Sequence, residues 1–99
     1  MNNAAIEIIV VRSHTDLNLS LLPKAVDIIW DATKLVVDQA FVVAYTALLK
    51  EIIDTSHSYV LVVETSYLDL FPANCMVVPT LGEAKDVIEM ERIERDLGF

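Results

Sequence analysis

Apolar residues are arranged along the chain in four short runs that suit buried strands. The first covers residues 5–11 (AIEIIVV) and the third covers residues 58–64 (SYVLVVE), and both are rich in β-branched side chains. The second covers residues 25–31 (AVDIIWD), and the fourth covers residues 75–78 (CMVV). Runs that are apolar almost throughout are typical of strands covered on both faces, so we predict a strand at each position.

From Asp38 onward the spacing of apolar residues changes to that of an amphipathic helix. One face carries apolar side chains at intervals of three, four or seven residues: Phe41, Tyr45, Leu48, Leu49 and Ile52. Asp38 is suited to cap the first turn, so we predict a helix from Asp38 to about residue 55. Thr80 and Glu83 form a capping-box pattern, and Gly98 provides a stop, which predicts a second helix over residues 80–97.

The connections between these elements are short. Residues 13–20 are polar and turn-like, and residues 67–71 suit a single helical turn closed by Pro72. Alternation of short apolar strands with helices favours a small α/β fold, in which helices cover a four-stranded, mostly parallel sheet. We expect one domain spanning residues 1–99.

The composition is more apolar than that of an average soluble domain. Apolar residues make up 55% of the 99 residues, against roughly 45–50% in soluble domains. The longest apolar run, Ala40–Tyr45, is far shorter than the ~20 residues of a membrane-spanning helix. No basic start followed by an apolar stretch suggests a signal peptide. We therefore expect a cytoplasmic protein that does not bind membranes, with the excess apolar surface buried in the sheet or an oligomer interface.

The charge balance narrows the class of partner. Seven Lys and Arg against 15 Asp and Glu give a net charge of −8, and no basic cluster offsets it. Such a surface repels phosphate backbones, so we expect no nucleic-acid partner. A basic protein surface remains compatible with this charge.

No catalytic or cofactor-binding pattern is present in the sequence. His14 and His57 lie 43 positions apart, which is not the spacing of a metal site, and Cys75 in an apolar strand is expected to be inert. Ser66, His57 and Asp69 could be drawn as a triad, but no Gly-rich turn accompanies them. The chain has two glycines, Gly82 and Gly98, too few for a phosphate-binding loop. We expect no enzyme activity, no metal and no cofactor.

The C-terminal segment VVPTLGEAKDVIEMERIERDLGF (residues 77–99) resembles the ending of small STAS-like proteins, which share the fold of bacterial anti-sigma-factor antagonists. It is most similar to a group of short Bacteroidota-type proteins. The segment YVLVVETSYLDLFPANCMVVPT (residues 59–80) also resembles their third strand, turn and fourth strand, whereas similarity before Asp38 is weak. The resemblance implies a four-stranded α/β sheet and a role in protein–protein recognition.

Two properties found among similar proteins, the ribonuclease Z name and a phosphorylatable serine, can be compared with the residues of this sequence. Members of this short group can carry the name ribonuclease Z, but that hydrolase needs a His-rich metal cluster, which two separated histidines do not supply. Regulatory STAS domains carry a phosphorylatable serine at the start of the helix after the second strand. The equivalent positions are Asp38, Gln39 and Ala40, so the switch serine is missing.

The predicted C-terminal helix has two apolar faces. Leu81, Ala84 and Ile88 form one face, which should pack on the sheet. Met90, Ile93 and Leu97 form a stripe on nearly the opposite side. The charged residues expected around this stripe are Glu89, Glu91, Arg92, Glu94, Arg95 and Asp96. Among them, Glu91 and Arg95 are spaced for an ion pair. An apolar stripe rimmed by charge is typical of a docking helix.

The sequence therefore predicts a non-catalytic protein–protein interaction module of STAS type, with Met90, Ile93 and Leu97 as contacts. The partner is either another protein or a second copy of the chain. Two alternatives stay open. One is an enzymatic or ribonuclease Z-associated role, and the other is a carrier that holds a small apolar ligand beside Trp30 and Tyr67.

Overall fold

A computed structural model describes residues 5–23, 25–52 and 56–98 of the chain. Within these residues, four strands and two α-helices alternate with three short 3₁₀ helices. In chain order the elements are β1 (Ile6–Val10), η1 (His14–Asp16), η2 (Leu19–Leu21), β2 (Asp27–Asp31), α1 (Gln39–Glu51), β3 (Tyr59–Val62), η3 (Thr65–Leu70), β4 (Val77–Val78) and α2 (Leu81–Asp96).

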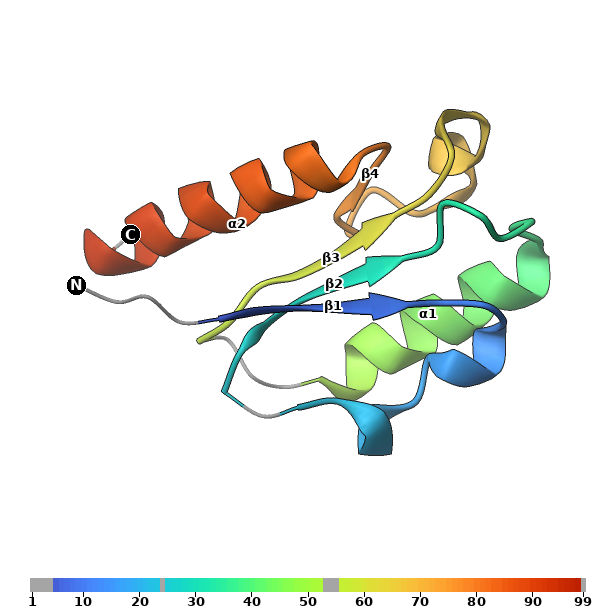
Figure 1. The fold of residues 1–99 in the computed structure, drawn as a ribbon, viewed down its shortest axis with the longest axis horizontal. Helices are drawn as coiled ribbons and strands as arrows, with labels where there is room; N and C mark the ends of the chain where they lie inside the picture. Colours follow the sequence, from blue (N-terminus) through green and yellow to red (C-terminus); the bar gives the residue numbers. More distant parts are fainter. Residues whose placement is uncertain (1–4, 24, 53–55, 99) are drawn as a thin grey trace.

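The four strands form one sheet in the order β1-β2-β3-β4, and every neighbouring pair is parallel. Ile8 lies beside Ile29, and Ile29 lies beside Val60, so these side chains share one face of the sheet. Figure 1 shows α1 below the sheet and α2 above it. The predicted α/β class with a small helix-covered sheet is confirmed, and the described strands are all parallel.

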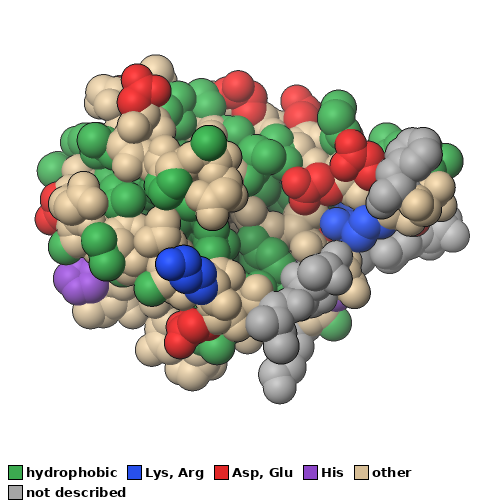
Figure 2. Space-filling view, turned by 180° about the vertical axis from the view of Figure 1, so that it is seen from behind, with side chains coloured by type: hydrophobic (Ala, Val, Ile, Leu, Met, Phe, Trp, Pro, Cys, Tyr) green, Lys and Arg blue, Asp and Glu red, His purple; other side chains and the backbone are tan. Residues whose placement is uncertain are grey.

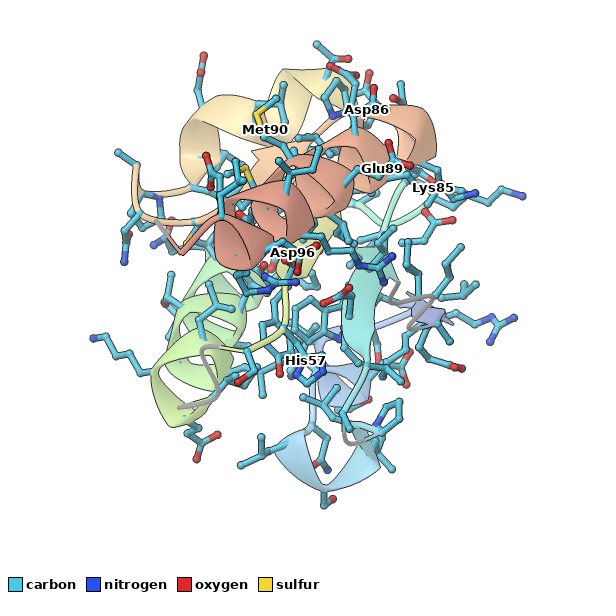
Figure 3. The ribbon with its side chains drawn as sticks, turned by 90° about the vertical axis from the view of Figure 1, so that its left-hand side faces the viewer. His57, Lys85, Asp86, Glu89, Met90 and Asp96 are labelled. Carbon is cyan, nitrogen blue, oxygen red and sulfur yellow. The ribbon has the colours of Figure 1, made fainter. Side chains whose placement is uncertain are left out.

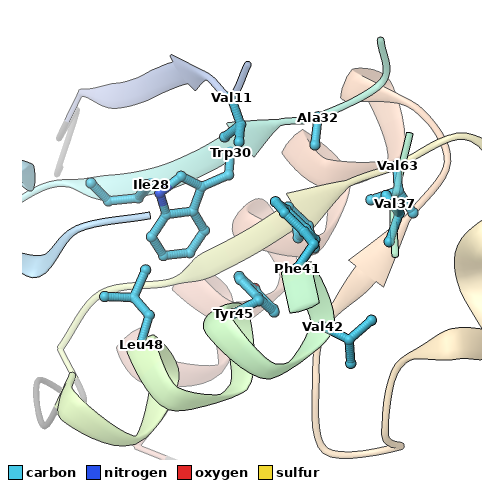
Figure 4. Close-up of a cluster of buried hydrophobic side chains, with 11 residues drawn as sticks. Val11, Ile28, Trp30, Ala32, Val37, Phe41, Val42, Tyr45, Leu48 and Val63 are labelled. Atoms are coloured by element: carbon cyan, nitrogen blue, oxygen red, sulfur yellow. The ribbon is translucent and has the colours of Figure 1, made fainter. Parts of the chain in front are cut away.

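The larger part of the core lies between the sheet and α1. Trp30 and Ile28 point from β2 toward Phe41, Tyr45 and Leu48 of α1 (Figure 4), and all five side chains are buried. Trp30 meets the Tyr45 ring edge to face, with ring centres 5.5 Å apart. The helical spacing of apolar residues after Asp38 thus produces the face that covers the sheet.

A smaller cluster lies on the opposite face, beneath α2. Ile29, Val60 and Val62 from the sheet pack against Ala84 and Ile88 of α2, and all five are fully buried. The prediction that Ala84 and Ile88 face the sheet is confirmed, and Leu81 packs at the margin of the same cluster. Two covered faces explain why the strands read as continuous apolar runs.

The main differences from the expected elements lie at their ends. The second strand begins at Asp27, not Ala25, because Ala25 has φ of +62°, which an extended strand does not allow. The first helix ends at Glu51, where Ile52 turns to an extended conformation; residues 53–55 of the predicted helix lie outside the described residues. The fourth strand is limited to Val77–Val78.

Candidate interaction site

The residues that the STAS resemblance predicts to replace the switch serine lie at the N-terminus of α1. Asp38 caps the helix, and its Oδ1 accepts a hydrogen bond from the Phe41 backbone N–H at 2.9 Å. Gln39 and Ala40 begin the helix, and all three residues are exposed. The cap explains why an acidic residue is suitable at position 38, and neither Gln39 nor Ala40 has a hydroxyl that could take a phosphate in place of a serine.

Helix α2 presents three large apolar side chains to solvent. Met90 is 64% exposed, Ile93 is 58% exposed and Leu97 is 63% exposed. Met90 is directed away from the sheet (Figure 3), on the side of α2 opposite the fully buried Ala84 and Ile88. We call the face formed by Met90, Ile93 and Leu97 the outer face of α2. The structure thus brings the three predicted contact residues together on one unpartnered surface.

An ionic cluster around the buried Asp27, which the sequence pattern did not predict, lies on the inner side of α2. Asp27, at the start of β2, is 1% exposed, and its Oδ2 accepts a hydrogen bond from Arg92 Nε at 2.6 Å. Arg95 Nη2 lies 3.6 Å from Asp27 Oδ1, and Arg95 Nη1 donates to Ser58 Oγ at 3.0 Å. The Ser58 backbone N–H also donates to Asp27 Oδ1, at 2.7 Å. This cluster ties the C-terminal half of α2 to the first residue of β2 and to the residue that precedes β3.

The cluster corrects the expected rim of the outer face. Arg92 and Arg95 follow Ile88 by four and seven residues, which places them on the sheet-facing side of the helix. Arg95 contacts Asp27 and Ser58 instead of forming the predicted pair with Glu91. The sequence did contain a signal for this cluster, because Asp27 lies in a strand predicted to be covered on both faces. A buried charge requires a cation or several hydrogen bonds.

Turning both arginines inward leaves an acidic rim around the outer face. Lys85 is the one exposed cation among the described residues of α2. The exposed carboxylates of the same helix are Glu83, Asp86, Glu89, Glu94 and Asp96. Figure 2 shows acidic side chains spaced along the upper edge of the molecule, the side on which Figure 1 places α2, with hydrophobic side chains between them.

The residues considered for catalysis are not brought together. His57 precedes β3, whereas Ser66 and Asp69 lie in η3 beyond the other end of that strand. The Ser66 hydroxyl donates to Glu64, which lowers the pKa of the Glu64 carboxyl; a second bond from the Ser66 backbone N–H adds to this effect. Partial burial raises the pKa of the Cys75 thiol, which disfavours the reactive thiolate.

Two other arrangements bear on metal and ligand binding. No group of three or more His, Cys, Asp or Glu residues within the described ranges could hold a metal ion. Trp30 is fully buried, with Tyr45 against its edge and Tyr59 stacked on its ring, and Tyr67 packs into the same cluster. Three aromatic side chains therefore belong to the packing around Trp30.

An open cavity of about 480 Å³ lies at the carboxyl ends of β1 and β2, and its charged lining residues are Arg12, Asp31 and Lys34. Asp31 Oδ1 already accepts hydrogen bonds from the Thr33 backbone N–H and hydroxyl, at 3.1 and 2.7 Å. Ligand crevices in open parallel sheets form where the strand order reverses. The order β1-β2-β3-β4 contains no reversal, so this cavity is a weaker candidate than the outer face of α2.

Comparison of the chain with protein-family models, with curated proteins and with solved structures found no match in any of the three. The resemblance of residues 59–99 to STAS-like proteins therefore stays a prediction. Among the helices of the described residues, none combines the length and the apolar character that crossing a membrane requires.

Proposed function

We propose that this chain is a non-catalytic protein-interaction module whose outer face of α2 docks a partner protein. The observation that carries the proposal is the exposure of Met90, Ile93 and Leu97, each more than half accessible, on a helix whose opposite face buries Ala84 and Ile88 completely. Truncating such side chains costs the folded monomer little, whereas burying them against a partner removes apolar surface from water. The predicted STAS-type role in protein recognition agrees with this proposal.

The rim indicates the chemistry of the partner. Five exposed carboxylates and one lysine make the surroundings of the apolar stripe strongly negative. A segment that carries apolar anchors flanked by Lys or Arg would satisfy both the stripe and the rim, as in helix-in-groove recognition. We therefore infer a basic, amphipathic protein segment as the occupant of the outer face.

A second copy of the chain is a poorer occupant of this particular surface. Packing α2 against α2 of another copy would bring two acidic rims together, and like charges across an interface oppose association. Self-association, which the sequence analysis left open, is therefore not expected through Met90, Ile93 and Leu97.

The proposal is tested with two synthetic helical peptides of equal length and identical Leu stripe, one with Lys and the other with Glu on its polar face. Fluorescence anisotropy measures the binding of each to the whole chain. We expect saturable binding of the Leu/Lys peptide only. Replacing Ile93 and Leu97 by Asp should weaken that binding at least tenfold, although the variant is more negative than the wild type.

The double substitution separates docking from simple charge attraction. Added carboxylates would strengthen a purely electrostatic interaction, so tighter or unchanged binding by the variant would contradict the proposal. Leu21→Asp provides a matched control, because Leu21 is 62% exposed but lies in η2, away from α2. The control variant should bind the Leu/Lys peptide as the wild type does.

A further inference from the structure

The two edges of the sheet are built differently. Strand β4 at one edge has two residues, is followed directly by Pro79 and packs against α2. Strand β1 at the other edge has five residues, IEIIV, without Pro or Lys. Short strands, prolines and charged side chains, lysine above all, keep sheet edges from pairing with other chains, and β1 carries one of these features, the charge of Glu7. Within the part of the chain that the structure describes, the β4 edge is therefore better protected than the β1 edge.

The backbone groups of β1 alternate between β2 and the open edge. The Val11 N–H donates to the Asp31 carbonyl at 2.8 Å. In a parallel pair alternate residues point to the neighbouring strand, so Glu7 and Ile9 also bond toward β2. The N–H and C=O groups of Ile6, Ile8 and Val10 then point outward. They form a row that only another extended strand can fill completely.

The side chains of these same residues extend the apolar surface of the sheet. Ile6, Ile8 and Val10 lie on the face that α2 covers farther along, since Ile8 is in register with buried Ile29. Helix α2 packs on β2, β3 and β4, and Figure 1 shows β1 in front of the part of the sheet that α2 crosses. Ile8 remains 39% exposed and Val10 remains 52% exposed.

We propose that the β1 edge pairs, antiparallel, with the β1 edge of a second copy of this chain. A two-fold axis at Ile8 places Ile8 opposite Ile8 of the second copy and Ile6 opposite Val10. This register uses every outward group of β1, forming up to about six hydrogen bonds. It also sets Glu7 opposite Ile9 of the second copy, so the two Glu7 carboxylates do not face each other.

The register favours a second copy because every opposed pair on the face of Ile6, Ile8 and Val10 is then apolar, Ile8 with Ile8 and Ile6 with Val10. The product is a continuous eight-stranded sheet. The two-fold axis would run perpendicular to that sheet, so both copies of α2 would lie on the same side. This inference goes beyond the proposed function and does not depend on it.

Ile8→Pro tests the pairing, because Pro removes an outward N–H without removing a β1–β2 hydrogen bond. Size-exclusion chromatography with light scattering measures the molar mass of the whole chain. We expect the wild type at twice the 11.0 kDa of one chain. Ile8→Pro should be a monomer with an unchanged circular dichroism spectrum, and Leu97→Asp should stay a dimer.

A wild type that is monomeric at millimolar concentration would overturn the proposal, as would a folded Ile8→Pro variant that is still a dimer. Hydrogen exchange on the wild type provides a readout that needs no variant. We expect the Ile6, Ile8 and Val10 amides to be protected, and to lose that protection on dilution, while Glu7 and Ile9 stay protected throughout. Fast exchange at Ile8 in concentrated protein would also overturn the proposal.

Discussion

At the scale of single residues, Asp27 connects the sheet to the surface proposed for docking. Its carboxylate is almost inaccessible and accepts bonds from Arg92, Ser58 and, at longer range, Arg95. Drawing the two arginines inward neutralises a buried charge that would otherwise destabilise the fold. The same contacts leave the exposed part of α2 acidic. One residue therefore affects both the stability of α2 on the sheet and the charge of its outer face.

Replacing Asp27 by Asn should lower the free energy of unfolding by about 2–3 kcal/mol. The reason is that Arg92 and Arg95 lose their shared counter-ion, although their partial exposure of 22% and 30% lessens the cost. Urea unfolding followed by circular dichroism measures the change. Asp69→Asn, at an exposed position in η3, is the matched control and should stay within about 0.5 kcal/mol. An equal loss in both variants would contradict this role of Asp27.

The buried phenol of Tyr45 makes the free energy of unfolding depend on pH in the alkaline range. Burial raises the pKa of the Tyr45 phenol well above its ordinary value, and the nearby Cys75 adds to the rise. The folded state therefore keeps the proton, while the unfolded chain loses it above a pH of about 10. Tyr45's contribution to stability is complete below that pH and is lost as pH rises further.

Between pH 9 and pH 11 the wild type should lose about 1 kcal/mol more unfolding free energy than Tyr45→Phe. Urea unfolding of both proteins at each pH measures the difference, because the other titrating groups are common to them. At neutral pH, Tyr45→Phe should cost little, since the Tyr45 hydroxyl has no hydrogen-bond partner among the described residues. Identical pH dependence in the two proteins would show that Tyr45 ionises freely when folded.

At the scale of elements, α2 has two faces with different tasks. Ala84 and Ile88 are fully buried against the sheet, while Met90 and Ile93 are mostly exposed. The opening turn is capped by Thr80, whose Oγ1 accepts a hydrogen bond from the Glu83 N–H at 3.1 Å and whose hydroxyl donates to the Glu83 carboxylate at 3.0 Å. The inner face therefore holds the helix in place without using the outer face.

Substitutions on the two faces should differ sharply in their effect on folding. Ile88→Ala should lower the unfolding free energy by about 2–4 kcal/mol, because it leaves a cavity between α2 and the sheet. Ile93→Ala should change it by less than about 0.5 kcal/mol, since its side chain is already exposed. Thermal or urea unfolding of the two variants provides the comparison. Comparable losses would mean that the outer face contributes to the fold itself.

The elements were largely predictable from sequence, and their long-range partners were not. Apolar runs rich in Val and Ile produced the strands, and the caps at Asp38 and Thr80 set the starts of both helices, because these signals are local. The Arg92–Asp27 bond joins residues 65 positions apart, and no local pattern encodes such a pairing. The stripe of Met90, Ile93 and Leu97 followed from helical periodicity alone, but its acidic rim depended on that distant contact.

At the scale of the whole molecule, the sheet organises two separate surfaces. Helix α1 covers one face over the larger core cluster, whereas α2 covers part of the other face and turns its outer face to solvent. Pairing of β1 edges would place two outer faces on the same side of a longer sheet. Such a dimer would present two acidic, apolar docking surfaces together, which would raise its avidity for a partner with two basic segments.

The central claim is that the outer face of α2 binds a basic amphipathic segment. Titrating ¹⁵N-labelled chain with the Leu/Lys peptide, and following its backbone amide chemical shifts, locates the contact residue by residue. We predict saturable shifts concentrated between Asp86 and Leu97, with little change in α1 or at the carboxyl ends of β1 and β2. Shifts centred on the cavity lined by Arg12 and Lys34, or an absence of saturable shifts on α2, would contradict the account.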